Sequence, residues 1–207
     1  MIIGVAGAHR VGKTTFAKDF ADAGEATLMV TSASEVFKAH GLDPAAPMDF
    51  KTRLYIQRHI LDHVQDVYSC WKAPYKVAIT DRTPIDMMAY TLAEVQSGTI
   101  QSSEVEAELE KYLDDCWTVA QNHLGAILVI QPGIPLIQEE GKARADKFYI
   151  EHLNSLICSL VHREDFETPS LIMKRHVVGR NDRVRLASEA LAGVAAAYKS
   201  QENRTLN

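Results

Sequence analysis

Two glycines, a lysine and two threonines near the start of the chain have the spacing of a loop that binds phosphate. In "GAHRVGKTT", residues 7–15, four residues separate the first glycine from the second. Glycines let the backbone curl so that successive N–H groups point at phosphate oxygens. Lys13 would add positive charge for the β- and γ-phosphates, and the Thr14 hydroxyl would bind Mg²⁺. We predict that nine residues bind a nucleotide: Gly7, Ala8, His9, Arg10, Val11, Gly12, Lys13, Thr14 and Thr15.

A second stretch, "YKVAITDRTPIDMMAY", places an acid and an arginine where a buried strand ends and a helix begins. A carboxylate at that position can bind Mg²⁺ or take the proton of an acceptor hydroxyl, so Asp81 is predicted to be catalytic and metal-binding. The neighbouring Arg82 could hold a phosphate bidentately, and we predict catalytic and substrate-binding roles for it. The competing interpretation is a helix cap at Thr83 with Arg82 as a surface arginine.

Three cations, Lys142, Arg144 and Lys147, precede a helix with an apolar stripe. A segment of this kind, about residues 132–147, could close over a transferring phosphoryl group as a lid. We predict a catalytic role for Arg144 and substrate binding by Lys142. Two adjacent glutamates dilute the positive charge, so the alternative of an ordinary solvated charge run stays open.

Polar residues extend the apolar face of a further predicted helix towards its N-terminus. The face of "FKTRLYIQRHILDHVQDVY" includes Ile60 and Val64, and one and two turns earlier it reaches Gln57 and Arg53. A buried amide needs hydrogen-bond partners. The partner of Gln57 is either a base edge of a phosphoryl acceptor or a neighbouring backbone group. We predict that Arg53 and Gln57 bind the acceptor.

These residues need a scaffold that brings them to one edge, and the pattern of the chain predicts one. Short apolar runs alternate with amphipathic stretches, as in a parallel sheet covered by helices. The strand candidates are Met1–Ala6, Thr27–Val30, Lys76–Thr80, Ala126–Ile130 and Ser170–Lys174. A helix should run from Lys13 to about Ala23, and further helices should be capped by Ser32, Thr83 and Ser103.

Length and composition indicate a single globular domain over residues 1–207, with a frayed tail from about residue 199. Of the 207 residues, 46% are apolar and 24% are charged, and the formal net charge is −5. An acidic balance argues against a protein that wraps nucleic acid. No signal peptide or membrane-spanning segment is evident, so we expect a cytoplasmic protein with no membrane partner, in the host cytoplasm if a phage encodes it.

The combination of GxxxxGKTT, a "DRTP" strand-to-helix turn and "PGIP" before a long helix resembles the nucleoside and nucleotide kinase branch of P-loop proteins. It is most similar to the nicotinamide-riboside-kinase-like ATPase domains, of which bacteriophages carry many compact versions. The resemblance covers roughly residues 1–197. It implies the three-layer α/β fold of P-loop NTPases, with a five-stranded parallel sheet in the order 2-3-1-4-5. The lid departs from the family's pattern. It has a single arginine, Arg144, together with lysines, where the lids of many nucleotide kinases are richer in arginine.

The resemblance further implies ATP and Mg²⁺ as cofactors and a nucleoside or nucleotide as phosphoryl acceptor, with a place in nucleotide metabolism. A comparable glutamine reads the base in deoxynucleoside kinases, which is one of the two interpretations of Gln57. Two other functions stay open. One is a kinase acting on a hydroxymethylated base in phage DNA, which a basic groove would favour, and the other is an ATP-binding regulator without a small-molecule acceptor. A homodimer is compatible with the sequence.

Overall fold

Five short apolar runs form one parallel sheet, in the order β2-β3-β1-β4-β5. The computed structural model describes residues 1–43, 46–72, 76–96, 98–138 and 145–205. The strands are β1 (Ile2–Ala6), β2 (Thr27–Leu28), β3 (Ala78–Thr80), β4 (Leu124–Ile130) and β5 (Ser170–Met173). The predicted strand order and fold class are therefore confirmed.

The central strand β1 pairs with β3 on one side and with β4 on the other. Ile3 of β1 lies opposite Ile79 in β3 and Ala126 in β4, and every pairing is parallel. In a parallel sheet all carboxyl ends lie at one edge, where open α/β folds bind their ligands. The segments that follow β1 and β3, which contain the predicted site residues, consequently meet there.

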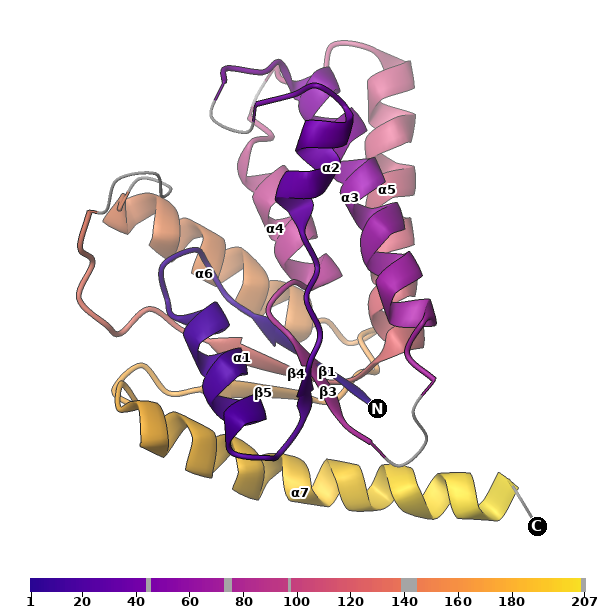
Figure 1. Ribbon diagram of the computed structural model, residues 1–207. Helices are drawn as coiled ribbons and strands as arrows, with labels where there is room; N and C mark the ends of the chain where they lie inside the picture. The colour runs from indigo at the N-terminus through magenta and orange to yellow at the C-terminus, as the bar shows by residue number, and fades with distance from the viewer. Residues whose placement is uncertain (44–45, 73–75, 97, 139–144, 206–207) are drawn as a thin grey trace.

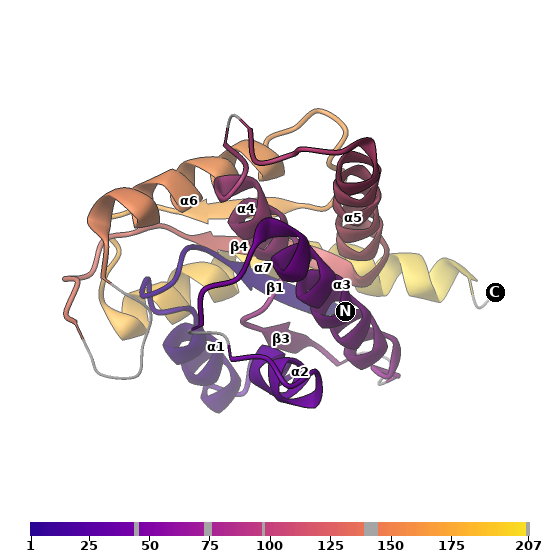
Figure 2. The same cartoon turned by 90° about the horizontal axis from the view of Figure 1, so that it is seen from above.

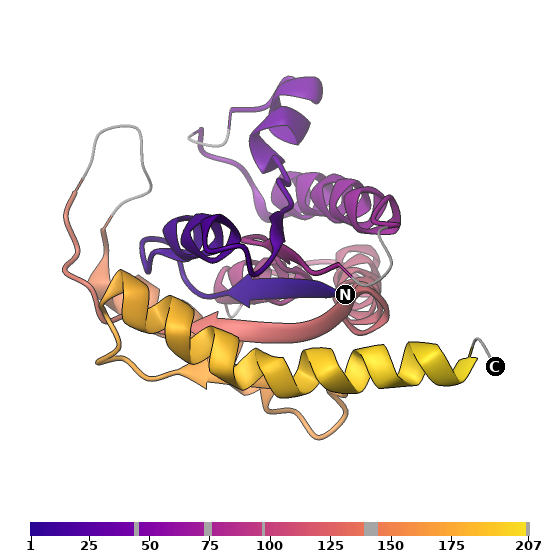
Figure 3. The same ribbon diagram turned by 60° about the horizontal axis from the view of Figure 1, so that its bottom comes forward.

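Helices cover both faces of the sheet (Figure 1). The described helices are α1 (Lys13–Asp22), α2 (Ala33–Ala39), α3 (Phe50–Ser69), α4 (Pro84–Ala93), α5 (Ser103–His123), α6 (Lys147–Val161) and α7 (Arg180–Thr205). Helices α1 and α7 contact each other on one face, and α7 runs beneath the sheet in Figure 3. Helices α3, α4 and α5 pack together on the other face, next to α6, as the view from above shows (Figure 2).

Several element ends differ from the prediction. Strand β2 ends at Leu28, two residues before its predicted end at Val30. The Val30 side chain is 72% exposed at the sheet's edge. Strand β4 begins at Leu124, two residues early, because the last turn of α5 leads directly into it. Helix α5 is capped by Ser102, whose hydroxyl accepts from the Val105 N–H, so the predicted cap at Ser103 was wrong by one residue.

The other helix starts follow the predicted capping chemistry. Ser32 accepts from the Glu35 N–H, and Thr83 accepts from the Asp86 N–H at 3.1 Å with Pro84 directly after it. Helix α7 continues to Thr205, where the sequence had indicated a frayed tail from about residue 199. The part of α7 before residue 199 is rich in alanine, and once such a helix is established each added helical residue costs little.

The strands β1, β3 and β4 supply the centre of the core, and their side chains are buried on both faces. We predict that Leu128→Ala lowers the free energy of unfolding by about 2–5 kcal/mol, because it leaves a cavity in a fully buried strand. Denaturant unfolding measures the loss. Val30→Ala, at an exposed position, is the matched control and should change stability by less than about 0.5 kcal/mol. Equal losses in the two variants would contradict the assigned core.

Candidate functional site

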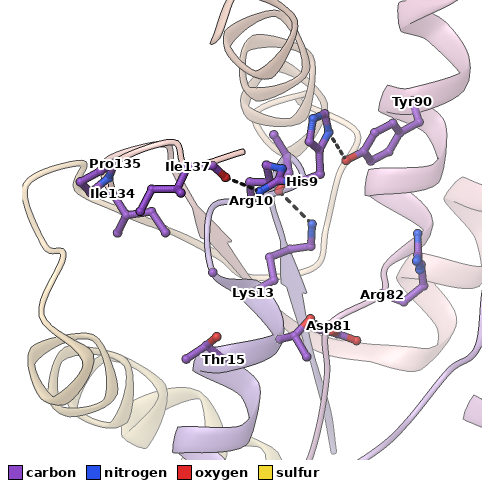
Figure 4. A pocket seen from close by; sticks show the side chains of 13 residues that line it. His9, Arg10, Lys13, Thr15, Asp81, Arg82, Tyr90, Ile134, Pro135 and Ile137 are labelled. Carbon is purple, nitrogen blue, oxygen red and sulfur yellow. Dashed lines mark hydrogen bonds between the residues drawn. The ribbon is translucent and has the colours of Figure 1, made fainter. Parts of the chain in front are cut away.

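The loop between β1 and α1 borders a cavity of about 580 Å³ at the carboxyl edge of the sheet (Figure 4). Seven of the nine predicted nucleotide-binding residues line it: Ala8, His9, Arg10, Gly12, Lys13, Thr14 and Thr15. The other two, Gly7 and Val11, are buried within the loop. Asp81 and Arg82, at the end of β3, line the same cavity. The structure thus brings together two segments that lie almost 70 residues apart in the chain.

The two glycines of the loop meet different steric demands. A Cβ at Gly7 would lie 2.5 Å from the backbone oxygen of Ile130, so only glycine fits beside strand β4. Gly12 has a φ of 91°, a left-handed conformation that side chains disfavour. Arg10 also adopts a positive φ, of 63°, and its guanidinium donates to the Ile137 carbonyl at 2.7 Å. These positive φ angles give the loop the curled backbone expected from its glycine spacing.

The ammonium of Lys13 lies inside the curl of the loop. Its Nζ donates to the carbonyls of Gly7 at 2.6 Å and Ala8 at 3.0 Å. Burial lowers the pKa of Lys13, while the nearby Asp86 carboxylate opposes that shift. A phosphate anion at this position would offset the burial of the charge and stabilise the protonated lysine.

The two predicted metal-binding side chains are in direct contact. The Thr14 hydroxyl donates to the Asp81 carboxylate, across from the first turn of α1 to the end of β3. Arg82 follows, and its backbone carbonyl accepts from the buried Tyr68 hydroxyl at 2.6 Å. The Arg82 Nε has no hydrogen-bond partner among the described residues. A hydroxyl and a carboxylate are oxygen ligands of the kind that Mg²⁺ prefers.

A buried carboxylate that the sequence analysis did not select holds the start of the loop. Asp86 on α4 is 1% exposed, and its Oδ1 accepts from the Gly7 N–H at 2.8 Å. Its Oδ2 is buried and has no hydrogen-bond partner in the part of the chain that the structure describes. Burial raises the pKa of Asp86, and the Lys13 charge opposes that shift. The sequence did contain a signal for this role, because Asp86 is the lone acid in the apolar run "PIDMMAY". Burying a carboxylate is costly unless it is hydrogen-bonded or paired with a charge.

An arginine from the far end of the chain holds the other end of the loop. Arg183 of α7 is 5% exposed and donates to the Val11 carbonyl at 3.0 Å and the Val177 carbonyl at 2.8 Å. Burial lowers its pKa. A Cβ on Gly12 would lie 3.1 Å from the Arg183 guanidinium. The charged run "RNDRVR" gave no indication which of its arginines would be buried.

Aromatic and apolar residues complete the walls of the cavity. The His9 Nδ1 is 3.1 Å from the Tyr90 hydroxyl, and the rings of His9 and Tyr149 have centroids 5.8 Å apart. Ile134, Pro135 and Ile137, from the segment after β4, line the opposite side. That segment begins the predicted lid.

Besides Gly7 and Val11, two of the described predicted site residues, Arg53 and Gln57, are not among those that line the cavity. Arg53 on α3 forms an ion pair with Glu94, the residue after α4. Gln57, one turn further along α3, is half-buried. The acceptor roles of Arg53 and Gln57 stay predictions. Lys142 and Arg144 lie outside the described residues, as does most of the charged part of the predicted lid.

The solved structures most informative for this geometry are kinases. Deoxyadenosine kinase from M. mycoides, with bound products dCMP and dCDP, matches with a TM-score of 0.64 at 14% identity, over 94% of this chain and 100% of that one. NadR protein in complex with NR matches with a TM-score of 0.67 at 18% identity, over 94% of this chain and half of that one. The chain has the fold of the P-loop kinases.

A third P-loop kinase structure gives the same result. Thymidylate kinase from Candida albicans matches with a TM-score of 0.62 at 12% identity, over 93% of this chain and 91% of that one. No family model and no curated protein matches the sequence. Among the described helices of this P-loop kinase fold, none has the length and apolar character needed to cross a membrane.

We predict that the Asp86 side chain stabilises the protein through its bond to the loop. Asp86→Ala leaves the buried Gly7 N–H without an acceptor and should lower the free energy of unfolding by about 1–3 kcal/mol. Asp86→Asn keeps an acceptor oxygen and should lose less. Urea unfolding of both variants measures the difference, and equal losses would contradict a role for this hydrogen bond.

The stability of the wild type relative to Asp86→Asn should depend on pH, and the pKa shift of Asp86 gives the sign of that dependence. Because the folded-state pKa of Asp86 is raised, its contribution to stability is full below the unfolded pKa of about 3.9 and is lost as the pH rises through the folded value. The stability of the wild type relative to Asp86→Asn should therefore fall as the pH increases above about 4. An opposite slope would contradict the assigned shift.

Proposed function

We propose that this protein is an ATP- and Mg²⁺-dependent kinase that transfers the γ-phosphoryl group to a nucleoside or a nucleotide. The observation that carries the proposal is the contact between the Thr14 hydroxyl and the Asp81 carboxylate, beside the ammonium of Lys13. Phosphoryl transfer depends on positioning and electrostatic stabilisation, and these three groups are the parts that it uses. The fold shared with nucleoside and nucleotide kinases supports the same assignment.

The residues present fit both cofactors. The loop from Gly7 to Thr15 offers backbone N–H groups and the N-terminus of α1 to the phosphates of ATP. Thr14 and Asp81 offer oxygen ligands to Mg²⁺. When bound, Mg²⁺ would neutralise negative charge that develops on the phosphate oxygens during transfer.

The chain's own side chains would then act as follows. Lys13 holds the β- and γ-phosphates. Arg82, whose Nε has no partner among the described residues, holds an oxygen of the transferring group. A hydroxyl or phosphate oxygen of the acceptor forms a bond to the γ-phosphorus while the bond to the β–γ bridging oxygen breaks and ADP leaves. Where the acceptor is a hydroxyl, its proton passes to the Asp81 carboxylate.

A panel of acceptors tests the proposal. Wild-type protein with ATP and Mg²⁺ should phosphorylate at least one nucleoside or nucleoside monophosphate, detected by mass spectrometry of the product. Lys13→Ala should form no product and should bind ATP much more weakly in calorimetry, while its circular dichroism spectrum is unchanged. ATP binding without product for any acceptor, or phosphorylation of hydroxymethylated DNA alone, would contradict the proposal.

A second prediction separates catalysis from nucleotide binding at Asp81. Asp81→Asn keeps the size and most hydrogen bonds of the side chain but removes its charge and basicity. Turnover should fall by about 10² or more, with little change in ATP affinity. Asp62→Asn, which removes an exposed carboxylate on α3, is the control and should retain wild-type turnover. Near-normal turnover in Asp81→Asn would contradict a catalytic role and favour the interpretation of this turn as a helix cap.

A further inference from the structure

The guanidinium of Arg183 is a positive charge buried against the phosphate loop, the segment at residues 7–15. Arg183 lies near the start of α7 and is 5% exposed, and its hydrogen bonds to the Val11 and Val177 carbonyls are both buried. Water therefore contributes little to the solvation of this charge. Burying an ion costs free energy unless an opposite charge lies close to it.

Within the part of the chain that the structure describes, no carboxylate balances Arg183. Both of its hydrogen-bond acceptors are uncharged carbonyls. Burial lowers its pKa, and among the described residues no acid opposes that shift. Two other arginines of α7 differ in this respect, because Arg180 pairs with Asp19 and Arg185 pairs with Glu189.

The other buried cation of the phosphate loop does have counter-charges. Burial lowers the pKa of Lys13, but the carboxylates of Asp86 and Asp81 oppose that shift. The charge of Lys13 is thus offset inside the protein. The charge of Arg183 is not offset by any described residue, so the surroundings of the loop keep an excess of buried positive charge.

Gly12 lies between the guanidinium of Arg183 and the cavity. A Cβ added at Gly12 would lie 3.1 Å from Arg183 Nη1 and 3.7 Å from Ile134 Cδ1. Gly12 and Ile134 both line the cavity. The thickness of one residue therefore separates the guanidinium from the space that the phosphates of a nucleotide would fill. Protein in that position screens a charge far less than water does.

Holding the loop in shape does not by itself require a charge at this position. A neutral amide side chain also has N–H groups that can donate to two carbonyls. It would do so without the cost of burying an ion. An arginine whose charge has no counter-ion among the described residues therefore indicates that the counter-ion comes from outside the chain, at the cavity that Gly12 lines.

We infer that Arg183 is a positioning residue whose charge, acting through the backbone at Val11 and Gly12, attracts the phosphates of the nucleotide that binds in the cavity. The inference rests on the proposed function, which supplies that nucleotide. Arg183 itself does not touch the ligand. The bound phosphates complete a charge balance that the chain leaves open.

Calorimetric titration with ATP and Mg²⁺ provides the first test. Arg183→Gln keeps N–H donors and removes the charge, whereas Arg183→Lys keeps the charge. The Kd for ATP should rise about tenfold or more in Arg183→Gln and less than about threefold in Arg183→Lys. Arg183→Met removes both charge and donors and should resemble Arg183→Gln. Equal Kd values for Arg183→Gln and Arg183→Lys would overturn the inference, as would a loss confined to Arg183→Met.

The charge of the ligand provides the second test. Without Mg²⁺, ATP carries one more negative charge than ADP. Removing the charge of Arg183 should therefore weaken the binding of ATP about threefold more than that of ADP. A loop that is only misshapen would lose affinity for both nucleotides by the same factor, because both place phosphates in it. One folded neutral variant, Arg183→Gln or Arg183→Met, suffices for this comparison, and equal factors would overturn the inference.

A matched control and the wild type separate the possible failures. Arg185→Gln removes an arginine from the exposed side of the same helix and should bind both nucleotides as the wild type does. Circular dichroism spectra and urea unfolding without ligand establish that each variant is folded. If the wild type binds no ATP, the proposed function fails and the inference with it. If the wild type binds ATP and phosphorylates an acceptor while the neutral variants bind ATP equally well, the inference alone fails.

Discussion

The hydrogen bond from the Gly7 N–H to the buried Asp86 carboxylate joins the two halves of this site. It ties the loop that follows β1 to the helix that follows β3, and these are the segments that carry Lys13, Thr14 and Asp81. The carboxylate's other oxygen is buried without a partner, which costs free energy. The hydrogen bond to Gly7 holds the start of α4 and the loop in one fixed relative position. The nearby Lys13 charge offsets part of the cost.

A buried cation makes the complementary contact. Arg183 donates to the Val11 carbonyl, so the loop is held near its first residue by an anion from one face of the sheet and near its end by a cation from the other. Both contacts are to backbone atoms, one to the N–H of Gly7 and one to the carbonyl of Val11. A loop held in this way is organised before a phosphate arrives, which reduces the entropy lost on binding.

Much of this arrangement was predictable from the sequence because local chemistry determines it. The phosphate loop was evident from glycine spacing, the caps at Ser32 and Thr83 from residue type, and the strand order from resemblance. The exact ends of β2 and β4 and the cap at Ser102 depend on tertiary contacts, and a pattern of single residues does not contain these. The roles of Asp86 and Arg183 were missed for the same reason. Their partners are backbone atoms more than 70 residues away, and no spacing rule refers to such atoms.

The position of Arg183 also bears on the order of events during synthesis. A polypeptide leaves the ribosome from its N-terminus, so the loop at residues 7–15 emerges well before Arg183, which lies 172 residues after its partner Val11. The central strand β1 likewise cannot form its pairings until β3 and β4 have been synthesised. The nascent chain therefore carries the loop sequence long before it carries the arginine that holds the loop's end. The loop can take its final shape only after Arg183 has been synthesised.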